Sequence, residues 1–413
     1  MNPDLHQAIC FFTRQTRIMD AMAVVCGTAD RLESAWDGNM AAPDDGVLPN
    51  ALFDLASLTK LFTGFSAMRL KEEGLLDFSR SVFSYDRRFE ALRDITVEQL
   101  LSFAVELRTP GRVDACPDRD AALRCLFGAF PVGPSGRRPY SDIPAMVLKY
   151  VLESAAGLPY MEILRTRFLD SLGMGETFCK VPEPRLGNCL CYDHEHRIEG
   201  TRWILRSDPP RGIPHDPKAA LIQGTTSDLC GHAGLFSTPD DLVRFCRGVL
   251  SGKVVSRPSL REMAVNRTGR RLPDGSYSQF LGYQCYIRHP NQFFSEIPAY
   301  MGRQALGIGG FTGNHLSVDP ERNLFCVMLG NRVRNRLTVL LPEEGKTFRD
   351  YGLNDDGSGL FRWSDGELIP SSVQYVHQKD VHLHRVVARV LGLRQMTFDE
   401  AAALEKDRAA GKE

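Results

Sequence analysis

The chain has 413 residues, of which 43% are apolar and 24% are charged, and its formal net charge at pH 7 is −1. This balance is typical of a globular protein with a large core, and it gives no reason to expect nucleic acid or an anionic membrane as a partner. The sequence shows no signal-peptide pattern and no apolar run of about 18 residues, and its eleven cysteines follow no disulfide-framework spacing. We therefore expect reduced thiols and a cytoplasmic location.

The first part of the chain is predicted to combine a helix with two strands. The spacing of apolar residues over 3–17 predicts a first helix, and segments 21–27 and 31–38 are typical of strands joined by a short turn. A longer helix follows and is expected to end at Gly74, because glycine is a natural C-terminal stop.

Beyond Gly74 the apolar periodicity stays mainly helical to about residue 175. Helices are predicted over 95–104, 141–157 and 158–175. Residues 176–230 are rich in Pro, Gly and Cys, so we expect this segment to be irregular.

The last part of the chain is predicted to return to strands. A helix over 237–252 comes first, with Thr238 as its cap and Pro239 in its first turn. Strand-like segments and a closing helix over 382–393 follow, the strands reading QFLGYQCYI, ALGIGGF, HLSVD and NLFCVMLGN. Because strands lie at both ends of the chain, the simplest architecture is an α/β domain built from both termini, with a mainly helical region inserted between them.

Lys60 is the first candidate for chemistry, because it follows Ser57 by three residues at the head of an apolar helical run. On a helix these positions share a face with Cβ atoms roughly 5–6 Å apart, so the amine can reach the hydroxyl. A serine hydroxyl needs a neighbouring base to act as a nucleophile, and a lysine needs burial or a cationic environment to become that base. The backbone N–H of Ser57 near a helix start could also hold an oxyanion. The alternative is a capping serine followed by a surface lysine.

A second candidate segment, PYSDIP, contains Tyr140 and Asp142. Tyr140 precedes a predicted helix start and lies between a proline and that helix, which is a suitable place for a side chain that points into a cleft. Asp142 is a natural N-cap for the same helix. The alternative is a structural tyrosine beside a capped helix.

Five segments together resemble the class C β-lactamase-like serine hydrolase family, which includes penicillin-recognising D,D-peptidases, esterases and a few acyltransferases. The similarity runs from about residue 20 to 335, with the motifs in the family's order. The segments are FDLASLTKLFTGFSAMRLKEEGLLDF, YSDIPAMVLKYVLESAAGLPYMEILRTRFLDSLGMGET, GIPHDPKAALIQ, GHAGLFSTPDDLVRFC and GIGGFTGNHLSVDPERNLFCVMLGNRV.

The resemblance implies a β-lactamase/D,D-peptidase-like fold of class α/β (α+β), in which both termini form an antiparallel sheet flanked by helices. The expected domains are 1–56 together with 222–413, and a mainly helical inserted domain over 57–221. The active site is expected between them.

The resemblance also implies roles for four side chains. Ser57 is the nucleophile that becomes acylated, Lys60 activates it, and Tyr140 exchanges protons with Ser57 and the leaving group. Either a cationic Lys60 lowers the pKa of Tyr140, or a neutral Lys60 acts directly, and the sequence leaves both open. Asp142 occupies the last position of the Y-x-D box, where it either holds Lys60 in place or only caps a helix.

The chain departs from the family pattern in two places. The third box falls on Ile308, Gly309 and Gly310, so its usual basic first residue is absent, which argues against recognition of penicillin-like or D-alanyl carboxylates. The two glycines still permit close backbone approach, and Phe311 follows where the family has its second oxyanion-hole N–H. Phe103 replaces a motif histidine beside the cleft, which is expected to reshape the cleft toward apolar substrates.

Other metal-ligating residue types are interpreted as structural. The segment with Cys179, Cys189, Cys191, His194 and His196 lacks the spacing of structural zinc sites, so reduced cysteines and surface histidines are favoured over a metal site. In the family-shared segments GIPHDP and CGHAGLF, His215 and His232 are the histidines, and His232 is expected to be a hydrogen-bonded core residue.

These observations predict a serine hydrolase that cleaves an ester or amide of a small-molecule acyl substrate through an acyl-enzyme at Ser57, without a cofactor. An acyltransferase using the same acyl-enzyme and a binding module that has lost turnover are the alternatives. A D,D-carboxypeptidase or β-lactamase is less favoured, because those enzymes act outside the membrane and no export signal is seen. The acyl group, the leaving group and the oligomeric state are not predicted.

Overall fold

The structure is a computed structural model that describes residues 1–40, 46–47, 49–207, 210–289, 296–363 and 365–394. Its main sheet has six strands in the order β2-β1-β12-β11-β10-β9, and every neighbouring pair is antiparallel. Strands from the two ends of the chain meet where β1 pairs with β12, so both termini build this sheet. The strands are β1 Ala21–Gly27, β2 Leu32–Gly38, β9 Tyr286–Ile287, β10 Leu306–Gly310, β11 Asn314–Asp319 and β12 Leu324–Gly330.

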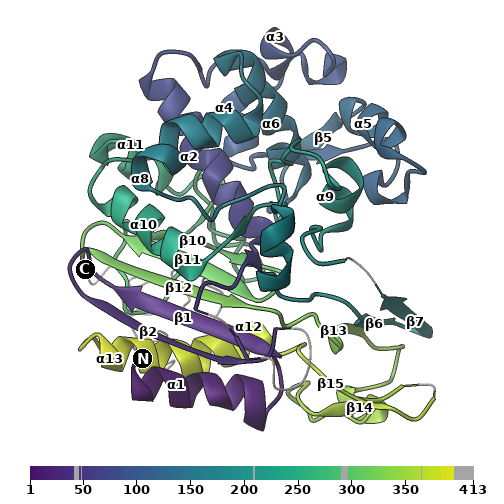
Figure 1. Cartoon of the computed structure of the whole chain (residues 1–413). Coiled ribbons are helices and arrows are strands. Elements are labelled where there is room, and N and C mark those ends of the chain that lie inside the picture. Colours follow the sequence, from purple (N-terminus) through teal and green to yellow (C-terminus); the bar gives the residue numbers. More distant parts are fainter. Residues whose placement is uncertain (41–45, 48, 208–209, 290–295, 364, 395–413) are drawn as a thin grey trace.

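Helices cover both faces of this sheet. Figure 1 shows α1 (Pro3–Cys10) and α13 (His384–Val390) below the sheet and the helical region above it. Leu5 and Ile9 on α1 and Val387 on α13 share one buried cluster with side chains of β1 and β12. Because β1 and β12 are buried on both faces, they are continuous apolar runs rather than alternating ones. The predicted α/β class with an antiparallel sheet formed by both termini is confirmed.

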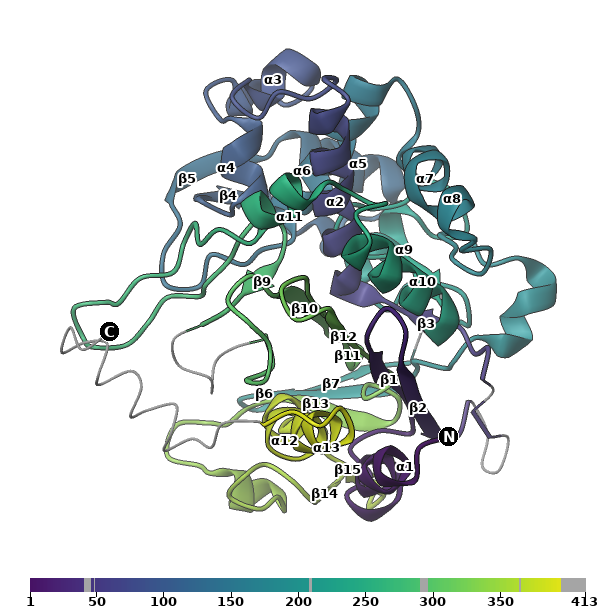
Figure 2. The same cartoon turned by 90° about the vertical axis from the view of Figure 1, so that its left-hand side faces the viewer.

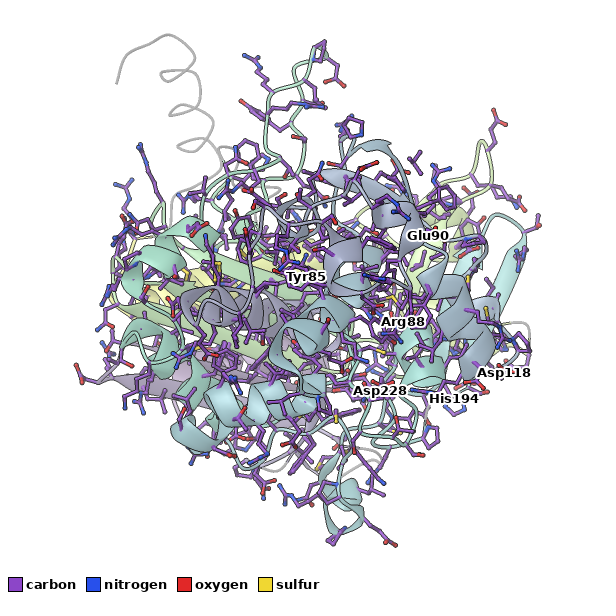
Figure 3. All side chains as sticks on the ribbon, turned by 90° about the horizontal axis from the view of Figure 1, so that it is seen from above. Tyr85, Arg88, Glu90, Asp118, His194 and Asp228 are labelled. Atoms are coloured by element: carbon purple, nitrogen blue, oxygen red, sulfur yellow. The ribbon has the colours of Figure 1, made fainter. Side chains whose placement is uncertain are left out.

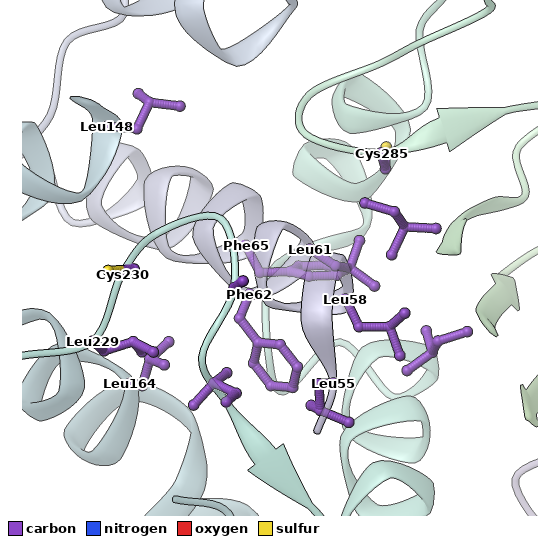
Figure 4. Packing of buried hydrophobic residues seen from close by; sticks show 14 of the residues in the cluster. Leu55, Leu58, Leu61, Phe62, Phe65, Leu148, Leu164, Leu229, Cys230 and Cys285 are labelled. Atoms are coloured by element: carbon purple, nitrogen blue, oxygen red, sulfur yellow. The ribbon is translucent and has the colours of Figure 1, made fainter. Parts of the chain in front are cut away.

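The helical region is built around α2 (Thr59–Glu72), which a short 3-10 turn, η2 (Ala56–Leu58), precedes. Figure 2 shows α2 upright in the middle of this region, and Figure 4 shows Leu58, Phe62 and other apolar side chains packed around it. The other helices of this region are α3 Val82–Tyr85, α4 Val97–Leu101, α5 Arg119–Phe127, α6 Ile143–Ala156, α7 Tyr160–Leu164, α8 Asp170–Leu172, α9 Pro217–Ile222, α10 Pro239–Leu250 and α11 Arg257–Met263.

Polar contacts connect helices of the helical region, and Figure 3 shows two of the residues involved, Asp118 and Asp228, from above. Asp228 accepts a hydrogen bond of 2.5 Å from the buried Lys149 of α6 and also pairs with Arg119 of α5. Asp118 caps α5 by accepting from the backbone N–H of Ala121. These contacts fix α5 and α6 on the side of the molecule where the cleft described below opens.

The segment 176–230, which was expected to be irregular, contains a β-hairpin. Its strands, β6 (Glu195–Glu199) and β7 (Arg202–Arg206), are antiparallel, and β6 also pairs in parallel with β13 (Arg336–Leu341). The prediction failed because half of the strand residues are charged and the apolar residues of β7 are consecutive, so the strands show no clear alternation. The predicted domain boundaries at 57 and 221 stay a prediction.

Several predicted elements differ in length from those observed. The first helix continues as a π-helical turn, Phe11–Gln15, and the closing helix begins with another, Lys379–Leu383. Of the strand-like run 279–287, only Tyr286–Ile287 forms a strand. The other strands are β3 Phe53–Asp54, β4 Val105–Arg108, β5 Phe130–Pro134, β8 Phe236–Ser237, β14 Leu360–Arg362 and β15 Leu368–Pro370, and the other α-helix is α12 Tyr375–Gln378. Within the described ranges, we find no helix with the length and apolar character needed to cross a bilayer.

Candidate active site

Ser57 lies in a strained turn at the start of the central helix. Ala56, the residue before it, has φ +46°, a left-handed conformation that a non-glycine residue adopts only when its surroundings hold it there. The buried carboxylate of Asp54 provides that support, because it accepts hydrogen bonds from the backbone N–H groups of Ala56 at 2.9 Å and His215 at 2.7 Å. The turn therefore presents Ser57 to the cleft from a rigid base.

Strand β10 closes against this turn through the glycines of the third box. A Cβ added at Gly310 would lie 2.9 Å from the carbonyl oxygen of Leu55, and one added at Gly309 would lie 2.9 Å from Glu296 Oε2. The expected close backbone approach is therefore observed. Ile308 is fully buried in the main core, whereas Phe311 at the end of β10 lines the cleft.

Lys60 is fully buried on α2, directly behind the serine. Its Nζ donates at 2.9 Å to Ser57 Oγ, at 2.7 Å to Asp142 Oδ1 and at 3.3 Å to the carbonyl oxygen of His232. Burial alone acts to lower the pKa of Lys60, but Asp142 and Tyr140 raise it above its ordinary value. The amine is therefore held as an ammonium with all three donors engaged.

Tyr140 is held beside Ser57 by aromatic packing. Its ring stacks on Tyr286 with centroids 5.5 Å apart and lies 5.6 Å from the ring of Phe103. The Lys60 ammonium lies 4.9 Å from the Tyr140 ring centroid. Burial raises the pKa of the Tyr140 phenol, and Lys60 offsets part of that effect. Phe103 therefore serves as a packing partner of Tyr140.

Asp142 holds Lys60 and does not cap the following helix. Its backbone is already helical, with φ −82° and ψ −36°, and its side chain makes no cap hydrogen bond to α6. The carboxylate instead accepts from Lys60 through Oδ1 and pairs with Lys218 at 3.0 Å through Oδ2. Although burial acts to raise the pKa of Asp142, Lys60, His232 and Lys218 lower it well below its usual range. Of the two alternatives for Asp142, a hydrogen bond that holds Lys60 and a helix cap, the contacts match the first.

The ion-pair chain continues behind Asp142 to residues that the sequence alone did not reveal. Lys218 also lies 3.3 Å from Asp216 Oδ2, and Asp216 Oδ1 lies 2.9 Å from Nε2 of the buried His232. His232 is thus the hydrogen-bonded core residue that was expected. Lys218 and Asp216 both lie in the sequence HDPK. The chain contains few lysines, so the presence of one in this family-shared segment was the sequence signal that could have pointed to Lys218.

Asp142, Asp216 and His232 also have the residue types and closeness of a metal site, since their ligand atoms lie within 4.8 Å of one another. Both carboxylates, however, already pair with ammonium groups, Lys60 and Lys218. This arrangement makes the cluster a set of ion pairs in which the lysines supply the positive charge.

The cysteine and histidine segment 179–196 does not converge within the described part of the chain. Cys179 Sγ donates to the carbonyl oxygen of Ser227, and Cys189 is buried in a separate small core. His196 is buried with its ring 4.7 Å from that of Trp363, so the prediction of a surface histidine was wrong there and holds only for the exposed His194.

Ser57, Tyr140 and Phe311 open into one cleft of about 560 Å³. Its wall is dominated by charged side chains, so the expectation of an apolar cleft was wrong. Phe103 packs behind Tyr140 and does not line the cleft, which is why its substitution did not make the cleft apolar. The charged residues that line the cleft are Arg112, Asp114, Asp142, Arg197, Glu199, Arg202, Arg206, Asp216 and Lys218.

Comparison with known proteins shows which family and which relatives the chain resembles. A sequence model of the family described as Beta-lactamase matches residues 11–342. A protein of Salmonella paratyphi B named D-alanyl-D-alanine carboxypeptidase is 26% identical over 338 residues, which cover 73% of this chain and 76% of the relative. A protein of the same name from Salmonella gallinarum is 25% identical over 334 residues, with the same coverage.

Solved structures show the same fold at low sequence identity. EstCE1, described as a hydrolase with promiscuous acyltransferase activity, has a TM-score of 0.65 at 17% identity, covering 92% of this chain and 97% of its own. Simvastatin synthase from Aspergillus terreus has a TM-score of 0.64 at 14% identity, covering 93% and 97%. An octameric penicillin-binding protein homologue from Pyrococcus abyssi has a TM-score of 0.58 at 18% identity, covering 79% and 72%.

Proposed function

We propose that this chain, which belongs to the beta-lactamase family, is a serine hydrolase that cleaves an ester or amide of a small acyl substrate through an acyl-enzyme at Ser57. One observation carries the proposal. The buried Lys60 ammonium lies 2.9 Å from Ser57 Oγ, and Tyr140 lines the same cleft as Ser57. Nucleophile, cationic partner and proton carrier are thus assembled from two distant segments.

In the proposed reaction, Lys60 is a fixed positive charge and Tyr140 carries the proton. The raised pKa of Lys60 keeps its ammonium in place, where it stabilises a phenolate at Tyr140 and an alkoxide at Ser57. The ionised Tyr140 takes the proton from Ser57 Oγ as that oxygen attacks the acyl carbonyl, and then returns it to the departing oxygen or nitrogen. Water repeats the sequence in reverse and releases the acid.

Hydrolysis is favoured over acyl transfer because of the character of the cleft. A dry, apolar cleft would favour an alcohol or amine acceptor over water, whereas the observed cleft is lined mainly by charged side chains. EstCE1, whose description names promiscuous acyltransferase activity, keeps acyl transfer as the alternative reaction of the same acyl-enzyme. All eleven cysteines are free thiols, which supports the proposal of a cytoplasmic enzyme.

The proposal is tested by labelling Ser57. The protein is incubated with a fluorophosphonate probe or a p-nitrophenyl ester, and the acylated residue is identified by intact-mass and peptide mass spectrometry. We expect one acyl group on Ser57 and none in Ser57→Ala. Ser66, a buried serine on the following helix α2, supplies the matched control Ser66→Ala. Labelling that survives Ser57→Ala, or no reaction with any acyl donor, would contradict the proposal.

A further inference from the structure

The hairpin β6–β7 turns one face toward Ser57 and the other toward a small apolar core. Successive side chains of a strand point to opposite faces, so the charged residues of this hairpin share one face with Ile204, and its other apolar residues lie on the opposite face. Arg197 and its register partner Ile204 line the cleft, whereas the ring of Trp203 lies 5.5 Å from that of Phe361 on the other side. The hairpin is thus anchored through its apolar face and presents its charged face to the substrate.

The inner corner of this charged face carries an excess of positive charge. Glu195 is fully buried, and its carboxylate contacts three side chains. The distances from its oxygens are 2.8 Å to a guanidinium nitrogen of Arg197, 3.3 Å to one of Arg206 and 3.0 Å to Nε2 of His215. Behind this corner, the guanidinium of Arg332 donates at 2.7 Å to the carbonyl oxygen of Phe311. Two guanidinium groups and one imidazole therefore share one carboxylate, and a third guanidinium lies behind Phe311.

The other charges that line the cleft balance one another. Arg112 pairs with Asp114 at 2.6 Å, and the turn of the hairpin sets Glu199 opposite Arg202. At the base of the cleft, two carboxylates face two lysines, as described for the ion-pair chain. The positive charge that remains uncompensated is therefore located at the corner formed by Arg197 and Arg206.

This corner adjoins the residue that follows the third box. The Arg197 guanidinium lies 5.2 Å from the centroid of the Phe311 ring, and Arg332 lies 4.7 Å from it. The ring of Phe311 also stacks on His215 at 6.0 Å. Ile308 brings no basic side chain to the cleft, whereas Arg197 of β6 and Arg206 of β7 both line it, with Arg197 beside Phe311.

We propose that the substrate carries an anionic group, such as a carboxylate, which binds at Arg197 and Arg206 while its acyl carbonyl reaches Ser57. Planar guanidinium groups match carboxylate and phosphate geometry, and in a partly buried corner they discriminate against a neutral analogue. This inference rests on the proposed acyl-enzyme function, because it places the anionic group relative to Ser57.

Two pairs of esters test the inference and locate the charge. Mono-p-nitrophenyl adipate and p-nitrophenyl methyl adipate differ only in a charge on the acyl side. The compounds 4-acetoxybenzoate and methyl 4-acetoxybenzoate differ in a charge on the leaving group, and their rates are compared after correction for their rates of uncatalysed hydrolysis. We expect kcat/KM to be about tenfold or more higher for the anionic member of one pair, mainly through KM, and this preference to decline at high salt. The pair that shows the preference identifies the side that carries the anion.

Variants of Arg197 make the test specific. Arg197→Gln leaves Glu195 with Arg206 and His215, so the fold is expected to persist, and the preference should fall to near parity. Arg197→Lys should restore part of it. Arg87→Gln is the matched control, because Arg87 is exposed in the helical region and does not line the cleft. If a variant unfolds, the salt dependence of the wild-type preference still decides the question.

The outcomes separate the inference from the function on which it rests. Equal or better use of the neutral member in both pairs, with turnover lost in Ser57→Ala, would overturn the anionic substrate and leave the hydrolase intact. The same holds if Arg197→Gln lowers kcat/KM equally for both members of a pair. If none of the four esters reacts in a Ser57-dependent way, the proposed function itself is contradicted.

Discussion

Replacing Asp142 by asparagine should remove the charge that keeps Lys60 protonated. The two groups lie 2.7 Å apart, and Lys60 is fully buried. Two unit charges about 4 Å apart near a protein surface attract by about 4 kcal/mol, so the loss of this carboxylate is large compared with any other single contact of Lys60. Asparagine has nearly the same shape and can still accept a hydrogen bond, so the change is mainly one of charge.

The expected effect on pH dependence follows from the direction of the pKa shift. In the wild type, burial acts to lower the pKa of Lys60, and Asp142 and Tyr140 overcome it, so the ammonium is lost only at pH values above its ordinary pKa. In Asp142→Asn, burial still lowers the pKa of Lys60, and of the two groups that raised it only Tyr140 remains. The Lys60 ammonium is therefore lost at a lower pH than in the wild type. Since the ammonium stabilises the phenolate at Tyr140, kcat/KM at alkaline pH should fall by about 100-fold.

The assay is kcat/KM for a p-nitrophenyl ester from pH 6 to 10, corrected for hydrolysis by Ser57→Ala. We expect the wild-type value to rise with pH, because the pKa of Tyr140 is raised by burial, and the Asp142→Asn profile to turn downward within this range. Asp114→Asn is the control, because Asp114 lines the same cleft but pairs with Arg112. A wild-type profile in a folded Asp142→Asn protein would refute the assignment of Lys60 as a fixed cation.

Three further predictions concern the structure around the site. Lys218→Met leaves the carboxylates of Asp142 and Asp216 without the cation between them, so the melting temperature and kcat should both fall, and Lys218→Arg should restore them. A melting temperature of Lys218→Met equal to that of the wild type would refute the ion-pair chain. Gly310→Ala places a Cβ 2.9 Å from a backbone oxygen, which should cost about 1–3 kcal/mol in the free energy of unfolding by urea and slow the labelling of Ser57. Although burial acts to raise the pKa of Glu195, His215 and Arg197 depress it. Its stabilisation is therefore present above its unfolded pKa of about 4.3 and lost at lower pH, so the stability difference between wild type and Glu195→Gln should shrink below about pH 4.

The sheet could be predicted from the sequence where strands are buried, and not where they are short or charged. The segments of β1 and β12 are apolar throughout, and burial on both faces explains why. The run 279–287 is also apolar, but its side chains Tyr283 and Cys285 are buried from loop positions, so an apolar run indicated burial without strand pairing. The hairpin β6–β7 did carry a signal, because Gly200, whose φ is +61°, lies in a two-residue turn between two short segments that both contain apolar residues.

The catalytic side chains could be predicted because their spacing follows from one helix and one helix start. The i, i+3 separation of Ser57 and Lys60 is local geometry, and the structure places their polar atoms within hydrogen-bond distance. The role of Asp142 was not decidable, because its sequence position suits a cap and an ion pair equally. Lys218 was missed because its partner Asp142 is distant in sequence and only the fold brings the two together.

The position of Ile308 explains how the chain separates catalysis from recognition. Its side chain is fully buried in the main core, so a basic residue there would have to be buried as well, at a cost of several kcal/mol without a partner. The positive charge instead comes from Arg197, whose strand is held by pairing with β13 and whose guanidinium remains partly exposed in the cleft. A change in the hairpin can therefore alter which substrates bind without disturbing the packing that holds Ser57, Lys60 and Tyr140, and the Arg197 variants should change specificity while the rate of Ser57 labelling by a neutral fluorophosphonate stays the same.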